Sequence, residues 1–579
     1  MERGREMDVA GAASTRRSLI PSFLIFLLLG CAVLGSAQAH SSSDQPVDRA
    51  RQLFAEQRWQ EIVSLGESAQ HPSAELDFYY GAALAQLGRW TAAQQVFSAG
   101  ARLQPDDKRF PLELAGVAFK QKQYAHAARY LRRALHLDPS DSYGNDFLGT
   151  VYFLQGNIEG ALKYWNRVGK PQIAEVRTAP TPRVNAALLD RAFAFAPASV
   201  LRLPDLQTSD ARVRELRIFP SYQFDVQARD DGKFDIVFRN RERDGWGQST
   251  WEKLFLLFRE LPFLAITPEI YNLRHHAINF VSLYRWDAEK RRVLAELSGP
   301  FKANPKFRSG LIADLRAENW DIRESFQGPA PLLGSLNLRR EAVGAEFASV
   351  ESGRWRWSAG VEISHRDFRS VFPGVALTPS LLAKGYQLKQ LAELNAELWR
   401  SPERRLTLEG GVSSQAGRIW SQPSHSFEKL QSSFRFQWFP QAQGDDYEVQ
   451  HEIRAGKTFG NVPFDELFML GLERDNDLSM RAHIGTRKGR KGSAPLGRNY
   501  FLSNWEADKN VYHNGIFAVK LGPFLDTGKI TDDSAGLGSH KWLYDLGAQA
   551  KVRVFGIGVA FSYGKDLRSG NNAFYVSMR

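Results

Sequence analysis

Cysteine is almost absent from the chain: Cys31 is the single cysteine among 579 residues. A disulfide within the chain is therefore excluded, and so is a metal site with several cysteine ligands. Long apolar runs are also scarce. The stretch 19–34 is the one segment apolar enough for a membrane-spanning helix, and the mean hydropathy of the chain is −0.37. The sequence thus excludes a membrane protein built from several helices.

Residue patterns that are typical of catalysis are missing as well. The sequence contains no G-x-S-x-G nucleophile elbow. The triplet Gly456-Lys457-Thr458 resembles the end of a phosphate-binding loop, but such a loop needs a glycine where His451 stands. The sequence therefore predicts that the protein is not an enzyme and that it uses no metal or other cofactor.

The N-terminal segment 1–39 has the three parts of a secretory signal peptide. Arg16 and Arg17 form a basic region, 19–34 is the apolar core, and 37–39 (Ala-Gln-Ala) is a small-x-small cleavage site. We therefore expect that the protein is exported and that this segment is removed.

Two other interpretations of the N-terminal segment stay open. It could remain as an uncleaved membrane anchor. Cys31 could also carry a lipid, because 28–31 (Leu-Leu-Gly-Cys) resembles a lipoprotein box. Cleavage is the favoured interpretation, and it leaves a mature chain that begins at His40 and has no cysteine, which suits passage through the oxidising periplasm.

The formal net charge of the chain is +11, from 75 basic and 64 acidic residues. Basic chains often bind nucleic acid, but export makes that partner unexpected here. The basic residues are spread over alternating segments rather than gathered in one tail. Lipopolysaccharide phosphates or a cation-lined lumen explain this charge better.

The front section repeats small, aromatic and proline residues with a period of 34. The repeating sets are Gly81, Ala115 and Gly149; Ala93, Ala127 and Ala161; Phe97, Leu131 and Trp165; and Pro105 and Pro139, with Ala134 and Tyr152 as further repeat positions. This pattern resembles the tetratricopeptide repeat. Three units cover about 74–173, and a degenerate half unit around Trp59 and Ala69 precedes them. An α-helical solenoid is therefore predicted at 50–173. Its groove implies periplasmic proteins or unfolded polypeptide as partners, although a spacer without a ligand stays an alternative.

A small α+β module is predicted at 183–243, after a linker at 178–181. An apolar stretch at 188–201 and a short helix at 209–216 come before a hairpin with an Asp-Gly turn. The hairpin residues are Tyr222, Phe224, Val226, Asp231, Gly232, Phe234, Ile236 and Phe238. This order resembles the polypeptide-transport-associated module that precedes certain outer-membrane barrels, which implies binding of extended substrates at a sheet edge. An unrelated α+β domain is the alternative, and a linker helix at 249–262 follows.

The back section, 266–579, alternates apolar and polar residues with a period of two, as in 355–363 and 434–438. A soluble β-sandwich also alternates. Three features favour an antiparallel transmembrane β-barrel: strands of about ten residues, full charges on the polar faces, and aromatic residues at strand ends. At roughly 20 residues per strand and loop, the section predicts about 16 strands.

A set of motifs in the last part of the chain goes beyond architecture. Phe464-Asp465-Glu466-Leu467-Phe468 is followed by a glycine-rich loop with Arg481, Ala482 and His483, and then by Phe524-Leu525-Asp526-Thr527-Gly528. The series resembles the C-terminal barrel of the outer-membrane protein assembly and translocation superfamily. That superfamily includes β-barrel assembly factors, two-partner secretion transporters and bacterial surface antigens.

The resemblance implies an ion pair inside the barrel, between Arg481 on a loop that folds back and Asp526 on an F-x-D-x-G strand with Phe524 and Gly528. An arginine suits this role because its planar fork bonds a carboxylate through two hydrogens. The sequence departs from the family pattern where Ala482 replaces a glycine and His483 an aromatic residue. It departs again at the chain end, which is Met578-Arg579 rather than an aromatic residue. Unrelated residues in a surface loop and a strand are the alternative to the pair.

Together these observations predict a multidomain protein of the bacterial outer membrane with its N-terminal part in the periplasm. By resemblance, the barrel inserts or translocates polypeptides, or lipids, while the repeats recruit substrate or a partner. A passive porin-like channel, whose repeats tether an unrelated periplasmic protein, is the alternative.

Overall fold

The computed structural model describes residues 45–578 apart from 70–72, 248–252, 255–256, 324–331, 373–376, 442–443, 514–516, 533–536, 538 and 555–556. The expected signal peptide 1–39 and Cys31 lie outside the described residues. So does much of the predicted linker helix at 249–262, where the described part includes the 3-10 helix η3 (Leu261–Phe263). Within the described ranges, no helix is both long and apolar enough to cross a membrane.

The chain divides into two compact units, 1–145 with 227–235, and 146–226 with 236–579. Consecutive helices of the first unit form hairpins: α1 (Gln45–Ala55) with α2 (Trp59–Glu67), α3 (Ala74–Gln86) with α4 (Trp90–Leu103), and α5 (Arg109–Lys120) with α6 (Tyr124–Leu137). The predicted half unit around Trp59 and Ala69 was too short, because α1 completes it. The solenoid also begins before residue 50. Helix α1 lacks the small-residue positions of the period, but it buries Ala50 and Leu53.

The positions that repeat every 34 residues make the contacts inside the hairpins. A Cβ atom on Gly81 would lie 2.7 Å from the Phe97 ring, and one on Gly149 would lie 2.3 Å from Trp165. The small residues therefore let paired helices approach closely. The remaining positions are buried within the helices, or, for the prolines, exposed just beyond a helix end: Ala93, Ala127, Ala134, Tyr152 and Ala161; Pro105 and Pro139. The buried positions of the repeat therefore pack the helices of each hairpin against one another.

Helix α7 (Ser142–Leu154), which includes the division at residue 145, forms a further hairpin with α8 (Ile158–Trp165), and an α+β module follows. The module consists of β1 (Ile173–Ala179), α9 (Ala186–Ala192), α10 (Leu203–Glu215), β2 (Ser221–Ala228) and β3 (Phe234–Arg241), with sheet order β1-β3-β2. The predicted boundaries were wrong at its start. Residues 178–179, expected as linker, end strand β1, so the sheet begins at Ile173 rather than after 183. Helix α10 starts before the predicted 209, because Pro204 suits the first turn of a helix.

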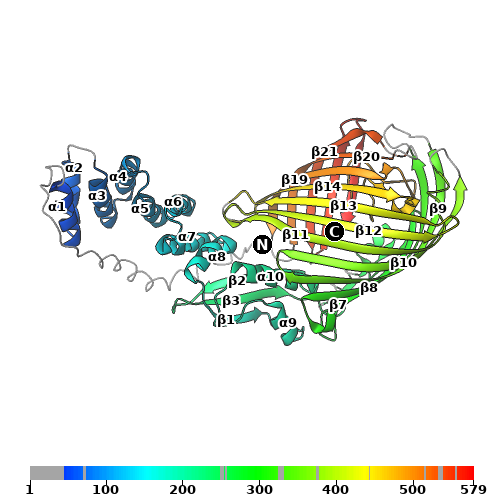
Figure 1. The fold of residues 1–579 in the computed structure, drawn as a ribbon, viewed down its shortest axis with the longest axis horizontal. Coiled ribbons are helices and arrows are strands. Elements are labelled where there is room, and N and C mark those ends of the chain that lie inside the picture. Colours follow the sequence, from blue (N-terminus) through cyan, green and yellow to red (C-terminus); the bar gives the residue numbers. More distant parts are fainter. Residues whose placement is uncertain are drawn as a thin grey trace, which may run out of the picture. The chain divides into compact units, whose positions relative to one another are not determined.

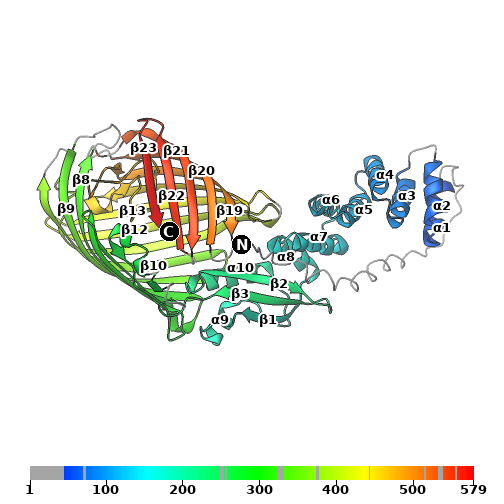
Figure 2. The same cartoon turned by 180° about the vertical axis from the view of Figure 1, so that it is seen from behind.

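The largest element is an antiparallel sheet that curls into a barrel (Figures 1 and 2). Its strands are β4 (Ala265–Ile266), β5 (Glu269–Leu273), β6 (Ile278–Trp286), β7 (Lys290–Pro300), β8 (Phe307–Arg323), β9 (Leu332–Ser352), β10 (Trp355–Phe372), β11 (Gly385–Ser401), β12 (Leu406–Trp420), β13 (His425–Trp438), β14 (Tyr447–Gly460), β16 (Thr486–Arg487), β17 (Arg490–Lys491), β19 (Asn499–His513), β20 (Phe517–Thr531), β21 (Ser539–Val554), β22 (Ile557–Asp566) and β23 (Asn572–Met578). Among the described residues these are 18 strands rather than about 16. Three of them, β4, β16 and β17, have only two residues each.

The barrel wall has its polar side inside and its apolar side outside. On β10, Val361 and Ile363 are 50% and 59% exposed, whereas Arg366 is fully buried. On β11, Tyr386 is exposed while Gln387 and Lys389 are buried. This arrangement is the reverse of that in a soluble protein, in which charged side chains face water and apolar ones form the core.

Two helices, α8 and α10, contact strand ends and turns at one end of the barrel. Helix α8 contacts the 3-10 turn η5 (Pro402–Arg404) between β11 and β12, where Asn157 donates to the carbonyl of Pro402 over 2.8 Å. Helix α10 contacts the C-terminal end of β9, where Arg212 donates to the carbonyl of Glu351 over 2.8 Å. Both helices therefore donate to backbone carbonyls of the barrel.

Candidate functional site: a loop anchored inside the barrel

The segment 461–498, which we call the lumen loop, joins β14 to β19 and folds back among the inward-facing side chains of the barrel. Its base is closed by a two-stranded sheet of β15 (Phe468–Met469) and β18 (Leu496–Gly497). The 3-10 turn η6 (Phe464–Glu466) lies before β15. Three groups of charged side chains attach the loop to different parts of the wall.

The first anchor joins Arg481 to Asp526 on β20. The Arg481 Nε donates to Asp526 Oδ2 over 2.9 Å, its NH2 group to Oδ1 over 2.5 Å, and its backbone N–H to Oδ2 over 3.0 Å. The guanidinium also bonds Glu506 over 2.6 Å and Gln549 over 2.9 Å. Both members of the pair are almost fully buried, at 3% and 0% exposure. The structure thus brings together the two residues that the family resemblance pairs.

Phe524 and Gly528 both contribute to this anchor, Phe524 through its ring and Gly528 through the space that its missing side chain leaves. The guanidinium carbon of Arg481 lies 3.8 Å from the centre of the Phe524 ring, a cation–π contact. A Cβ atom on Gly528 would lie 2.9 Å from Met480 Sδ and 3.1 Å from Leu470 Cδ1, so a side chain there would force these loop side chains to shift. The F-x-D-x-G strand therefore supplies a stacking face, a carboxylate and a gap in one short stretch.

Ala482 and His483, the two departures from the family pattern, also contact the wall. The Ala482 N–H donates to Asp545 Oδ2 over 2.7 Å. The backbone of Ala482 does not have a positive φ, so this position does not need a glycine. His483 Nδ1 lies 3.1 Å from Asp545 Oδ2 and its Nε2 lies 3.7 Å from Asp566 Oδ2.

A second anchor lies at η6, and the sequence analysis assigned it no role. Glu466 lies 3.1 Å from Lys389 Nζ and Asp465 lies 3.4 Å from an Arg366 nitrogen. Arg340 and Lys429 complete a ring of four cations from β9, β10, β11 and β13. The signal in the sequence was a cation at an inward position on each of these strands. Their convergence on one turn depends on the curvature of the barrel.

A third anchor fixes the loop to the first strands of the barrel. Asp475 accepts from Arg292 over 2.9 Å and from Arg285 over 3.1 Å, and it also contacts Lys290. Within the loop, Lys491 lies 3.1 Å from Glu473. The loop is thus tied to β6 and β7, to β9, β10, β11 and β13, and to β20, β21 and β22, so it crosses the interior rather than lining one side.

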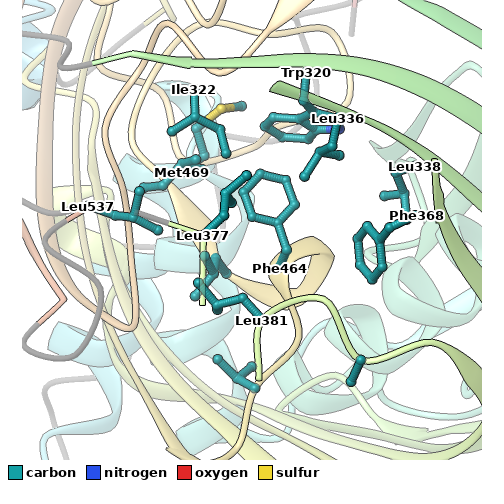
Figure 3. Close-up of a cluster of buried hydrophobic side chains, with 14 of the residues drawn as sticks. Trp320, Ile322, Leu336, Leu338, Phe368, Leu377, Leu381, Phe464, Met469 and Leu537 are labelled. Atoms are coloured by element: carbon teal, nitrogen blue, oxygen red, sulfur yellow. The ribbon is translucent and has the colours of Figure 1, made fainter. Parts of the chain in front are cut away.

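A cluster of apolar side chains lies inside the barrel at the C-terminal end of β8 and the N-terminal end of β9. Figure 3 shows Phe464 of the loop pointing at Trp320, and their ring centres are 4.9 Å apart. Leu377 and Leu381 reach the cluster from the β10–β11 connection and Leu537 from the β20–β21 connection. Three connections therefore contribute side chains to an apolar core in this part of the lumen.

Comparisons with known proteins give a likeness in structure only. No family model matches the sequence, and no curated protein matches it. The barrel is similar to those of BamA and CdiB. BamA from Haemophilus ducreyi lacking POTRA domains 1–3 is 11% identical, with a TM-score of 0.41 over 70% of this chain and 83% of that chain. CdiB from Escherichia coli is 14% identical, with a TM-score of 0.44 over 70% of this chain and 74% of that chain. MamA is 14% identical, with a TM-score of 0.21 over 22% of this chain and 75% of that chain.

Proposed function

We propose that the protein is an outer-membrane barrel that inserts or translocates polypeptides, with helical repeats that recruit the substrate or a partner in the periplasm. The observation that carries the proposal is the anchored lumen loop, because Arg481 and Asp526 meet inside the barrel with the geometry that the assembly and translocation superfamily implies.

The outer face of the barrel supports a membrane location. Large apolar side chains are exposed on successive strands. They include Leu311, Leu315, Val343, Val361, Ile363, Leu394, Val412, Phe434, Trp505, Leu525 and Phe561. A soluble protein rarely exposes an apolar surface that extends over so many elements. Lipid would cover this band, and the strand pairing would satisfy the backbone within it.

The interior counts against the passive channel. A porin-type lumen is open to water, whereas here a loop with three ionic anchors crosses the lumen, and the Phe464 cluster packs part of it. Ion flow would need these contacts to separate. An action on polypeptides fits this interior better than ion conduction does. The polypeptide would arrive at the end of the barrel that contacts α8 and α10.

Reconstitution of the full chain into liposomes tests the proposal. Urea-denatured outer-membrane barrel polypeptide would be diluted into liposomes with and without the protein, and its insertion followed by protease protection. We expect faster insertion with the protein. A chain without 45–137 should insert the same substrate, but only at higher substrate concentration, because recruitment is lost. Ion conductance with no effect on substrate insertion would instead support the passive channel.

A further inference from the structure

His483 lies between two carboxylates that belong to different strands. Its Nδ1 faces Asp545 on β21 at 3.1 Å, and its Nε2 faces Asp566 on β22 at 3.7 Å. All three side chains are buried, at 6%, 0% and 4% exposure. A metal ion on the imidazole would need both carboxylates on the side of one ring nitrogen. Because each nitrogen has its own carboxylate, the arrangement suits a ring that carries two protons.

The two buried carboxylates beside the His483 ring also favour the positively charged imidazolium. Among the ion pairs of the described residues, His483 is the only basic side chain that pairs with Asp545 or Asp566. Asp526 on β20 also acts on the His483 ring through its charge. The nearby Arg481 is already bonded to Asp526 and Glu506. Buried carboxylates without a cation are costly. A neutral imidazole would leave two of them close together with hydrogen bonds alone.

We propose that His483 is a proton-dependent attachment of the lumen loop, in which the imidazolium ties the loop to β21 and β22 and its deprotonation loosens that attachment. This chain therefore adds a pH response to the loop that the Arg481 pair does not provide, because an arginine keeps its charge. The inference concerns how the loop is held and does not depend on the cargo.

The direction of the response follows from the surroundings of the ring. Burial alone would lower the pKa of His483, but its hydrogen bond to Asp545 and the charges of Asp545, Asp566 and Asp526 hold that pKa above its ordinary value. The stabilising contribution is therefore complete below the unfolded-state pKa of about 6.5 and is lost as pH rises through the folded-state pKa. The loop is held most firmly in mildly acidic medium.

The test compares His483→Gln, which keeps a hydrogen-bonding side chain but cannot become charged, with the full wild-type chain in planar bilayers. Basal conductance events would be counted at about pH 5.5 and at about pH 8.5, on either side of an ordinary histidine pKa. We expect wild-type openings to become severalfold more frequent at the higher pH. The variant should open at the high frequency at both values. His451→Gln is the matched control, because His451 lies in the same barrel against Ser503 and Trp505 and should keep the wild-type profile.

If the glutamine variant does not fold, His483→Arg is measured in the same bilayer assay. Its permanent positive charge should keep openings rare at both pH values. A wild-type profile without pH dependence would overturn the inference, and so would a His483→Gln profile that equals the wild type. If the protein fails to enter bilayers, the proposed function is contradicted. The pH dependence of urea unfolding in detergent, compared between wild type and His483→Gln, then decides this inference separately.

Discussion

Replacement of Arg481 by alanine is the sharpest test of the lumen loop. The guanidinium bonds Asp526 twice, Glu506 once and Gln549 once, and it covers the Phe524 ring. Its removal leaves Asp526, which is fully buried, with only the loop N–H and Asn504 as donors. Glu506 keeps its contact with Lys551. The main effect is therefore one uncompensated buried carboxylate.

The magnitude follows from that burial. Removal of one partner of a buried ion pair typically costs about 3–5 kcal/mol, and the exposures of 3% and 0% for Arg481 and Asp526 justify the use of this range. Asp526→Ala should cost a similar amount, because it leaves the buried arginine with Glu506 as its one carboxylate partner and Gln549 as its other hydrogen-bond acceptor. The double variant should be only slightly less stable than either single one, since both changes remove the same interaction.

Urea unfolding in detergent micelles, followed by tryptophan fluorescence, measures these differences. Arg435→Ala is the matched control, because Arg435 pairs with Glu452 on the same barrel but is 56% exposed there. A pair of that kind contributes less than about 1 kcal/mol. Additive effects of the Arg481 and Asp526 changes, or a loss no larger than that of Arg435→Ala, would refute the reasoning and remove the main support for the proposed function.

Three further predictions test other parts of the structure. Glu466→Gln leaves the four cations around η6 with one carboxylate fewer, so it should destabilise the barrel by about 3 kcal/mol or more in the same unfolding assay; an unchanged midpoint would contradict the second anchor. Gly149→Ala should cost about 1–3 kcal/mol by thermal circular dichroism, because its Cβ meets Trp165, whereas Gly116→Ala, whose Cβ meets nothing within 4 Å, should be neutral or stabilising. Val343→Arg places a charge on the apolar outer face and should cost about 2–4 kcal/mol, seen as a smaller heat-resistant fraction on gels, while Val343→Leu should leave that fraction unchanged.

Local patterns in the sequence were enough to predict the kinds of elements. The period of 34 located the helical pairs, because a close helix contact needs a small residue at a fixed place, as at Gly81 and Gly149. The period of two located the wall strands, because successive side chains of a strand point to opposite faces. These rules act within one element or between chain neighbours, so the sequence alone determined them.

The sequence predicted the ends of helices and strands, and the first helix of the stack, less well. Helix α1 pairs with α2 although it lacks the landmarks of the period, because burial of Ala50 and Leu53 is sufficient for a hairpin at the end of a stack. The last residues of strand β1 fall within the predicted linker at 178–181. The burial pattern of the strand has one fully buried residue, Ile173, and therefore only a weak signal.

The charged anchors inside the barrel required the tertiary structure. Arg481 and Asp526 could be paired beforehand only through a family resemblance, because 45 residues separate them. The partners of Glu466 could not be predicted, since Lys389 lies 77 residues away and the other cations stand on three further strands. The sequence places each charge on the inner face of its own strand. Only the curvature of the closed wall decides which of those faces meet the same turn of the loop, because that depends on strand order, register and tilt together.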